Sequence, residues 1–279
     1  MPGRLELLAG NTRFQVTVGI VIFVTLVGLI GPHFTRDPTD RLGGRYDPPC
    51  WKFKLGTDNA GRDVWSQLVN GIQNSLMVGG IAGGIAIVIA FLMGGVGGYK
   101  GGLTDEGINT VCNIFLVLPV IPMLIVLSRL AGRRTLFMVA LIISILMWAG
   151  AARAIRSQVL SLKERGFVDL ARISGKGDVS ILFLEILPNM LAYVVIQFFS
   201  IVGGAIVTEA GISMLGLGPT TVSTLGSMLH WTIMKQAIHG GVWWWFVPPG
   251  LIVLFFTGSL FMVGSTIDDA LNPKLRGVL

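Results

Sequence analysis

The chain has 279 residues, of which 52% are hydrophobic and only 13% are charged, and its formal net charge is +6. Soluble domains usually carry about 25% charged residues, so this composition excludes a single soluble core and predicts an integral membrane protein. No basic run contains interleaved aromatic residues, which excludes nucleic acid as the expected partner and leaves the Lys and Arg residues as charges that flank the membrane.

Charge-free apolar runs predict six membrane-spanning helices and an all-α fold, because a spanning helix needs about 20 apolar residues. The predicted spans cover residues 16–30, 75–96, 107–128, 135–152, 186–208 and 243–263. Pro119 and Pro122 are expected to kink the third span, since an interior proline removes a helix hydrogen bond.

The orientation of these spans should follow the distribution of Lys and Arg. With the N-terminus inside, almost equal numbers fall on the two sides of the membrane, so this rule leaves the orientation open. Arg129, Arg133 and Arg134 would then lie outside, against the usual bias.

A long polar connection follows the first span and contains GTDNAGRD at residues 56–63. Asp58 and Asp63 raise a calcium-binding interpretation, but a charged turn in which Asp58 caps the next helix is favoured. No metal site is predicted. Cys50 in this connection and Cys112 in the third span are interpreted as structural, because no Cys/His spacing typical of zinc and no disulfide framework is present.

The connection between the fourth and fifth spans is also polar, and residues 165–188 read RGFVDLARISGKGDVSILFLEILP. Apolar residues between Phe167 and Ile173 recur at helical spacing. They predict a short amphipathic helix with its apolar side chains on one face and Asp169 and Arg172 on the opposite face.

Two glycines, Gly175 and Gly177, are expected to stop this helix, because glycine adopts the left-handed conformation that ends helices. Asp178 is expected to cap a second helix over residues 179–186, and Pro188 marks the entry into the fifth span. An ordinary surface helix explains the pattern too. The order of helix, glycine hinge, second helix and Leu-Pro favours a rigid knob that docks in a groove of a partner.

Residues 210–234 carry no charge but are rich in Gly, Ser, Thr and Pro. They predict an exposed or re-entrant loop with a short amphipathic helix over residues 225–234, and a seventh span is the alternative. Glu209, just before them, is a candidate for the substrate path, because an acid at membrane depth is costly and tends to be functional. The favoured placement is the outer rim, where it would contact a partner or the amino group of a substrate.

The aromatic run Trp243–Trp245 is typical of the belt at a membrane interface, at the start of the sixth span. His230 and His239 lie nine residues apart in the outer region. They are interpreted as surface residues, because two imidazoles without neighbouring thiolates or carboxylates make a weak metal site.

Residues 165–188 resemble the coupling motif of ABC importer permeases, in which Glu-Ala-Ala is followed by three residues, Gly, and later Ile-x-Leu-Pro. Here Asp-Leu-Ala at 169–171 is followed after three residues by Gly175, and Ile-Leu-Pro occupies 186–188. Asp replaces Glu and keeps its charge, and the bulkier Leu replaces the first Ala, while the spacing is retained.

Four further stretches, in the same order along the chain, resemble permeases of the dipeptide, oligopeptide and nickel branch of this family. They are GTDNAGRDVWS at 56–66, GGYKGG at 97–102, EAGISMLGLG at 209–218 and DDALNPKLR at 268–276. Together they indicate a similarity to the second permease subunit of such importers over most of the chain.

The resemblance implies a six-helix type I permease fold in the inner membrane of a prokaryote, with the coupling helices and both termini in the cytoplasm. It implies a homologous second permease, two ATPase subunits and an extracytoplasmic substrate-binding protein as partners, beside membrane lipid. Residues 1–73 would hold the first span and its outer loop, and residues 74–279 the permease domain with a coupling loop at 157–187. The coupling residues carried over are Asp169, Leu170, Ala171, Arg172, Gly175, Leu187 and Pro188.

The sequence contains no GxxxxGK[ST] phosphate loop, so ATP-Mg is expected on partner subunits, and this chain is expected to be a transport subunit without a cofactor or enzymatic activity of its own. The expected cargo is a small peptide, with oligosaccharide or nickel as alternatives on the same fold. A membrane enzyme or an autonomous channel is disfavoured, because the spans are almost free of ionisable residues.

Overall fold

The computed structural model describes residues 11–271, and the surroundings of side chains are described up to Ile267. Within this range the regular elements are helices, and two isolated β-bridges occur in the first connection. The prediction of an all-α fold is confirmed. The elements are α2 (Thr12–Ile30), η1 (Gly31–Phe34), α3 (Val64–Lys100), α4 (Gly102–Val117), α5 (Val120–Leu130), α6 (Leu136–Leu162), α7 (Gly166–Ile173), α8 (Asp178–Ser180), η2 (Ile181–Ile186), α9 (Leu187–Met214), α10 (Leu225–Met234) and α11 (Trp243–Leu271).

Five of the described helices are long and apolar enough to cross a membrane, and α4 with α5 forms a sixth candidate that is bent by 89°. Six spans result when the bent pair counts as one. The third span is broken and not merely kinked, because Pro119 adopts an extended conformation (ψ 110°) between Val117 and Val120. Pro122 is accommodated in the first turn of α5, where N–H groups have no partner within the helix.

Several helices run past the apolar stretches that predicted them, because a charge-free run marks only the part of a helix that lies in hydrocarbon. α3 has 37 residues and a length of roughly 55 Å at about 1.5 Å per residue, against about 30 Å of hydrocarbon. α6 continues to Leu162, and α8, η2 and α9 form one helical unit from Asp178 to Met214. Within the proposed coupling loop at 157–187, only residues 163–165 and 174–177 lie outside helices.

α3 is the central helix, and α6 and α9 pack along it. Its glycines allow a close approach to α6. A Cβ atom on Gly94 would lie 2.2 Å from the backbone oxygen of Ala152, and one on Gly98 would lie 2.9 Å from that of Arg156. Small residues let helix backbones approach each other in membranes, so this close contact explains the glycines at these two positions.

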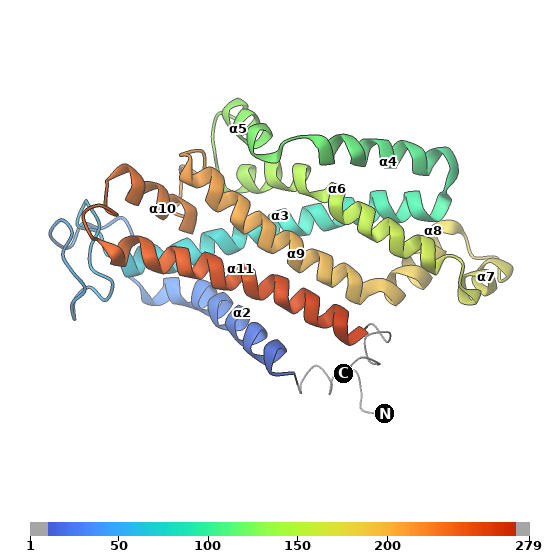
Figure 1. Cartoon of the computed structure of the whole chain (residues 1–279), viewed down its shortest axis with the longest axis horizontal. Helices are drawn as coiled ribbons and strands as arrows, with labels where there is room; N and C mark the ends of the chain where they lie inside the picture. The colour runs from blue at the N-terminus through green and yellow to red at the C-terminus, as the bar shows by residue number, and fades with distance from the viewer. Residues whose placement is uncertain (1–10, 272–279) are drawn as a thin grey trace.

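The elongated bundle has two different ends (Figure 1). The short helices α7 and α8 lie at one end, and the first connection and α10 lie at the other. The predicted helix over residues 225–234 is confirmed as α10, and the alternative of a seventh span is excluded because α10 has only 10 residues.

Two of the aspartates in the first connection, Asp58 and Asp63, stabilise it in roles other than those predicted. Asp63, not Asp58, caps α3, accepting hydrogen bonds from the Trp65 N–H at 3.2 Å and the Ser66 hydroxyl at 2.7 Å. Asp58 accepts from two backbone N–H groups of its own turn and from the Gln67 side chain at 3.0 Å. Prediction failed here because both residues are good caps and only the register of the turn distinguishes them.

The tryptophan run is not a simple interfacial belt. Trp243 is 53% exposed, whereas Trp245 is 1% exposed and packs in the core. The Trp244 indole N–H donates to the backbone oxygen of Thr57 at 3.3 Å. Two of the three rings therefore hold the first connection against the start of α11, since a helix places consecutive residues on different faces.

Candidate functional site

The helix α7 is the most distinctive feature of its end of the molecule, where it projects beyond the long helices (Figure 1). It connects α6 to the helical unit formed by α8, η2 and α9, and it packs against η2. Its position is therefore fixed by the end of α6 on one side and by the start of the α8–η2–α9 unit on the other.

The apolar side chains of α7 do not share one face, contrary to the prediction. Val168 is fully buried and Ala171 is 6% exposed, while Leu170 is 67% exposed and Ile173 is 84% exposed. Residues three apart lie on the same side of a helix, so each pair occupies its own face. One face joins the core, and the other presents bare apolar surface.

Two charges accompany this outer face. Arg172 Nη1 lies 3.3 Å from Asp169 Oδ1, and both side chains are exposed. The Arg172 guanidinium also lies over the Tyr99 ring, 5.7 Å from its centroid. A side-chain hydrogen bond with Tyr99 is the main cause that raises the pKa of Arg172 above its usual value, with smaller contributions from nearby acids. The residue is therefore a permanent cation.

The end of α7 is a complete Schellman motif. Gly175 has φ +77°, its N–H donates to the Arg172 oxygen at 3.0 Å, and the Lys176 N–H donates to the Ala171 oxygen at 3.1 Å. The left-handed conformation suits glycine and is costly for other residues. The prediction that Gly175 forms the turn after this helix is confirmed.

The second helix differs from its prediction at both ends. Asp178 is the first residue of α8 and makes no capping bond, and its side chain instead accepts a hydrogen bond from the Tyr99 hydroxyl at 3.2 Å. Residues 181–186 form a π-helix, in which the Leu187 N–H donates to the Leu182 oxygen. Pro188 follows directly and does not end the helix, because a π-turn accommodates the missing proline N–H.

The predicted coupling residues therefore divide into four groups. Asp169, Leu170 and Arg172 lie together on the outside of α7, and Ala171 belongs to the core. Gly175 forms the turn after α7. The half-buried Leu187 and the exposed Pro188 lie at the base of α9, away from the outer face of α7.

Two ion pairs that sequence reasoning missed support this end of the molecule. Arg156 on α6 forms a two-pronged bond with Asp105 on α4, with both N–O distances 2.5 Å. Lys176 pairs with Glu185 across the turn, also at 2.5 Å. Arg156 and Asp105 are 51 residues apart, so no local pattern indicates their contact.

Glu209 is fully buried where α3, α9 and α10 meet. One carboxylate oxygen accepts from Ser213 at 2.5 Å and from Thr224 at 2.6 Å, and the other accepts from Ser75 at 3.4 Å. Thr224 also caps α10 by accepting from the Ser227 N–H. Through these hydrogen bonds Glu209 connects α10 to α3 and α9.

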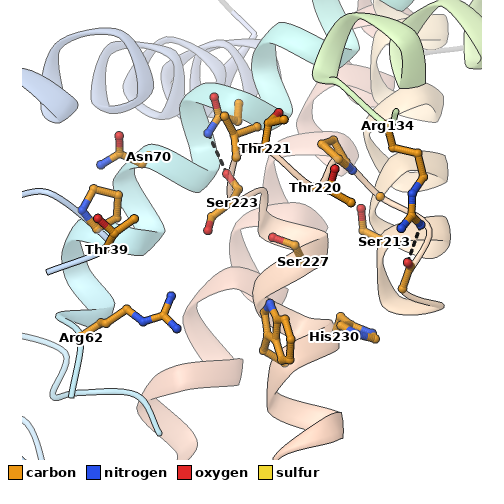
Figure 2. Close-up of a pocket in the computed structure, with 17 residues that line it drawn as sticks. Thr39, Arg62, Asn70, Arg134, Ser213, Thr220, Thr221, Ser223, Ser227 and His230 are labelled. Carbon is orange, nitrogen blue, oxygen red and sulfur yellow. Dashed lines mark hydrogen bonds between the residues drawn. The ribbon is translucent and has the colours of Figure 1, made fainter. Parts of the chain in front are cut away.

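A polar cavity of about 680 Å³ lies at the end opposite α7, next to this cluster (Figure 2). Its walls come from the first connection, α3, the α5–α6 connection, the segment after α9, and α10. Two guanidinium groups, from Arg62 and Arg134, line it together with amide and hydroxyl groups. Sequence reasoning did not find this cavity, because its walls are far apart in the chain.

Comparison with known proteins gives a consistent assignment. Residues 86–277 match the family described as "Binding-protein-dependent transport system inner membrane component". The oligopeptide transport system permease protein OppC of Bacillus subtilis is 31% identical over 95% of this chain and 87% of its own length. The dipeptide transport system permease proteins DppC of Bacillus subtilis and Haemophilus influenzae are 30% and 28% identical, each over 92% of this chain and over 80% and 88% of their own lengths.

The family match covers well over half of the chain, and the relatives align over most of their own lengths. The predictions of a multi-pass permease and of a transport subunit, not an enzyme, are confirmed by this match. The chain belongs to the family of binding-protein-dependent transport system inner membrane components.

Proposed function

We propose that this chain is a permease subunit of an ATP-driven importer of small peptides. It forms half of the translocation path beside a homologous second permease. Two ATPase subunits bind ATP-Mg and drive the movement, and a substrate-binding protein delivers the peptide at the end that carries the first connection and α10.

The observation that carries this proposal is the outer face of α7. Leu170 and Ile173 are exposed on a helix whose other face is packed into the core and whose end is fixed at Gly175. A rigid knob with bare apolar surface and an adjoining ion pair is suited to a groove on a partner. Such a knob transmits a push from an ATPase subunit to α6 and α9.

The proposed roles follow the positions of the side chains. Leu170 and Ile173 fill the partner's groove, and Asp169 and Arg172 contact its rim. Gly175 sets the angle of α7. Leu187 and Pro188 lie at the π-helical base through which movement of the knob reaches α9.

The names of the relatives support a peptide as cargo, because they are described as oligopeptide and dipeptide permeases. The proposed orientation places α7 in the cytoplasm, since ATP is available there, and the first connection outside. The described start of α2 and the end of α11 then lie on the cytoplasmic side.

The test of this proposal is co-purification of the ATPase subunits with Leu170→Glu. The side chain is 67% exposed, so the variant should reach the membrane in wild-type amounts. A buried charge in the partner's groove is costly, so the ATPase chains should be lost from the purified complex.

The matched control is Leu103→Glu on α4, at the same end of the molecule. Leu103 is 87% exposed and lies outside α7, so this variant should keep its ATPase subunits. Equal retention of ATPase chains by both variants would refute α7 as the docking element.

A further inference from the structure

The cavity at the outer end of the proposed permease is lined by two arginines and, among the described residues, by no acid. Among the described residues that line it there is no Asp or Glu, whereas Arg62, Arg134 and the amides of Asn70 and Asn74 are present. Figure 2 shows Arg62 and Asn70 on one side of the recess and Arg134 on the opposite side. A recess with donors and positive charge favours an anionic ligand.

Arg134 is the best placed of these cations. Its Nη1 donates to the Gly216 backbone oxygen at 2.6 Å, and its own backbone oxygen accepts from the Thr220 N–H at 2.9 Å. Throughout the described chain its guanidinium has no carboxylate partner, although it carries five N–H donors. The side chain is therefore held in position with donors left for a ligand.

A second cavity of about 500 Å³ lies on the other side of the same arginine and shares Arg134 and Gly216 with the first. It is also lined by Arg129 and by Ser128, a residue that is only 2% exposed. The Ser128 hydroxyl is buried and has no hydrogen-bond partner among the residues that the structure describes. Buried polar groups are rarely left unpaired, so this hydroxyl indicates that a polar group joins it here.

The arginines of this region also depart from the usual distribution of Lys and Arg across a membrane. Under the proposed orientation Arg129, Arg133 and Arg134 lie on the outer side, where Lys and Arg are usually depleted. Two of these three arginines line the cavities. Their position in the cavities therefore favours a role in ligand binding over a role in setting the orientation of the helices in the membrane.

By contrast, the positive charge of Arg62 is partly neutralised by an acid. Its Nε lies 3.5 Å from Asp58, which already accepts from three other donors. Arg62 therefore adds some positive charge to the recess, and Arg134 supplies the uncompensated charge.

We infer that Arg134 is a specificity-determining residue that binds a carboxylate of the peptide as it enters the permease. This inference rests on the proposed function. The ligand is a peptide carboxylate, from the C-terminus or from an acidic side chain, held by the free N–H groups of Arg134 with Arg129 and Ser128 nearby. Pockets for small ligands usually measure about 300–1,000 Å³, so the first cavity has room for the end of a small peptide.

The experiment uses the complete importer in proteoliposomes, with its binding protein saturated by a labelled tripeptide. Uptake is compared for the free acid, the C-terminal amide, and the amide of a peptide with an Asp side chain. The binding protein is the same throughout, so its own preference cancels between variants. The wild type should import carboxylate-bearing peptides about tenfold faster than the plain amide, the size expected for one charge-assisted hydrogen bond.

Arg134→Gln should bring this ratio close to one, because the glutamine amide carries no charge and ends before the position of the guanidinium Nη1. Arg133→Gln is the matched control, since the same charge is lost next to the site at an exposed residue that lines neither cavity. It should keep the wild-type ratio. If Arg134→Gln slows only the free acid, the bound carboxylate is that of the C-terminus. If it slows only the amide with an Asp side chain, the bound carboxylate is that of the side chain.

An unchanged ratio in Arg134→Gln would overturn the inference. If that variant disturbs the turn at Gly216, Arg129→Gln answers the same question. A smaller loss is expected, because the Arg129 side chain is exposed and no hydrogen bond within the described residues holds it in place. Wild-type liposomes that import no peptide at all would instead refute the proposed function, a result distinct from equal ratios.

Discussion

Gly175 is the residue on which the angle of α7 depends. Proline fixes φ near −65° and lacks an N–H, whereas Gly175 has φ +77° and donates to Arg172. Gly175→Pro should therefore leave the chain inserted in the membrane but misplace α7. ATP hydrolysis by the purified complex should continue while peptide uptake falls to background, as measured in proteoliposomes.

Gly177→Pro is the matched control for this prediction. Gly177 has φ −74°, which proline adopts without strain, so this variant should retain most of its uptake. If both prolines left uptake coupled to hydrolysis, α7 would not be the transmitting element.

Glu209 is expected to matter for stability and not for substrate contact. Glu209→Ala leaves the hydroxyls of Ser213 and Thr224 without an acceptor in a buried site, which should cost about 3 kcal/mol of unfolding free energy. Glu209→Gln should cost less, since both hydroxyls donate to a single oxygen that glutamine retains. Thermal unfolding of the detergent-purified complex measures the difference, and equal Tm values for the two variants would contradict this account.

Residue roles were predicted well from the sequence only where a local backbone rule applied. The turn at Gly175 was predicted correctly, because glycine readily adopts the left-handed conformation that ends a helix. The two faces of α7 were merged into one, because the residues alone do not show which apolar pair meets η2. The burial of Glu209 was not predicted, since its hydroxyl partners Ser75 and Thr224 lie 134 and 15 residues away in the sequence.

At the scale of elements, the contact between α3 and α6 should be sensitive to one methyl group. A Cβ on Gly94 would lie 2.2 Å from the Ala152 backbone oxygen, and neither backbone yields easily. Gly94→Ala should therefore reach the upper end of the about 1–3 kcal/mol typical of overpacking. The amount of folded protein in membranes and its Tm report this loss.

Gly84→Ala in the same helix is the control, because a Cβ there meets nothing within 4 Å. It should behave as the wild type. A Gly94→Ala variant as stable as Gly84→Ala would show that α3 and α6 are not packed as closely as described.

Helix positions were predictable from apolar runs, but helix ends were not. α6 and the unit of α8, η2 and α9 extend into charged sequence because their ends leave the hydrocarbon. The break between α4 and α5 was anticipated as a kink from Pro119, and its 89° angle depends on packing that a sequence does not display.

At the scale of the whole molecule, the proposed orientation is open to a labelling test. Cys50 is exposed in the first connection and Cys112 is buried, so the chain carries one natural label. A membrane-impermeant maleimide should label Cys50 in intact cells. In a Cys50→Ser background, Leu170→Cys should be labelled only after the membrane is permeabilised.

Labelling of both positions from the same side would contradict the proposed topology. The sequence left this orientation open, because Lys and Arg are almost evenly distributed across the spans. The structure places the first connection and α7 at opposite ends (Figure 1), which makes one label on each sufficient to decide the question.

The family was predictable from short sequence motifs that occur in the same order along the chain. Several of these motifs form recognisable parts of the structure. GTDNAGRD forms the turn before α3, and the stretch that starts at Glu209 anchors α10. The match at 268–276 lies largely outside the described residues, as do both chain ends. The outer cavity was not predictable, because five separate segments form its walls.

We propose that α7 conveys ATP-driven movement from partner subunits to this permease. The most direct measurement is peptide uptake by proteoliposomes that hold the complete complex, with ATP supplied on the side of α7 and the loaded binding protein on the side of the first connection. The account predicts uptake only when both are present on those sides, and none by this chain alone. Uptake by the chain without ATPase subunits would contradict it.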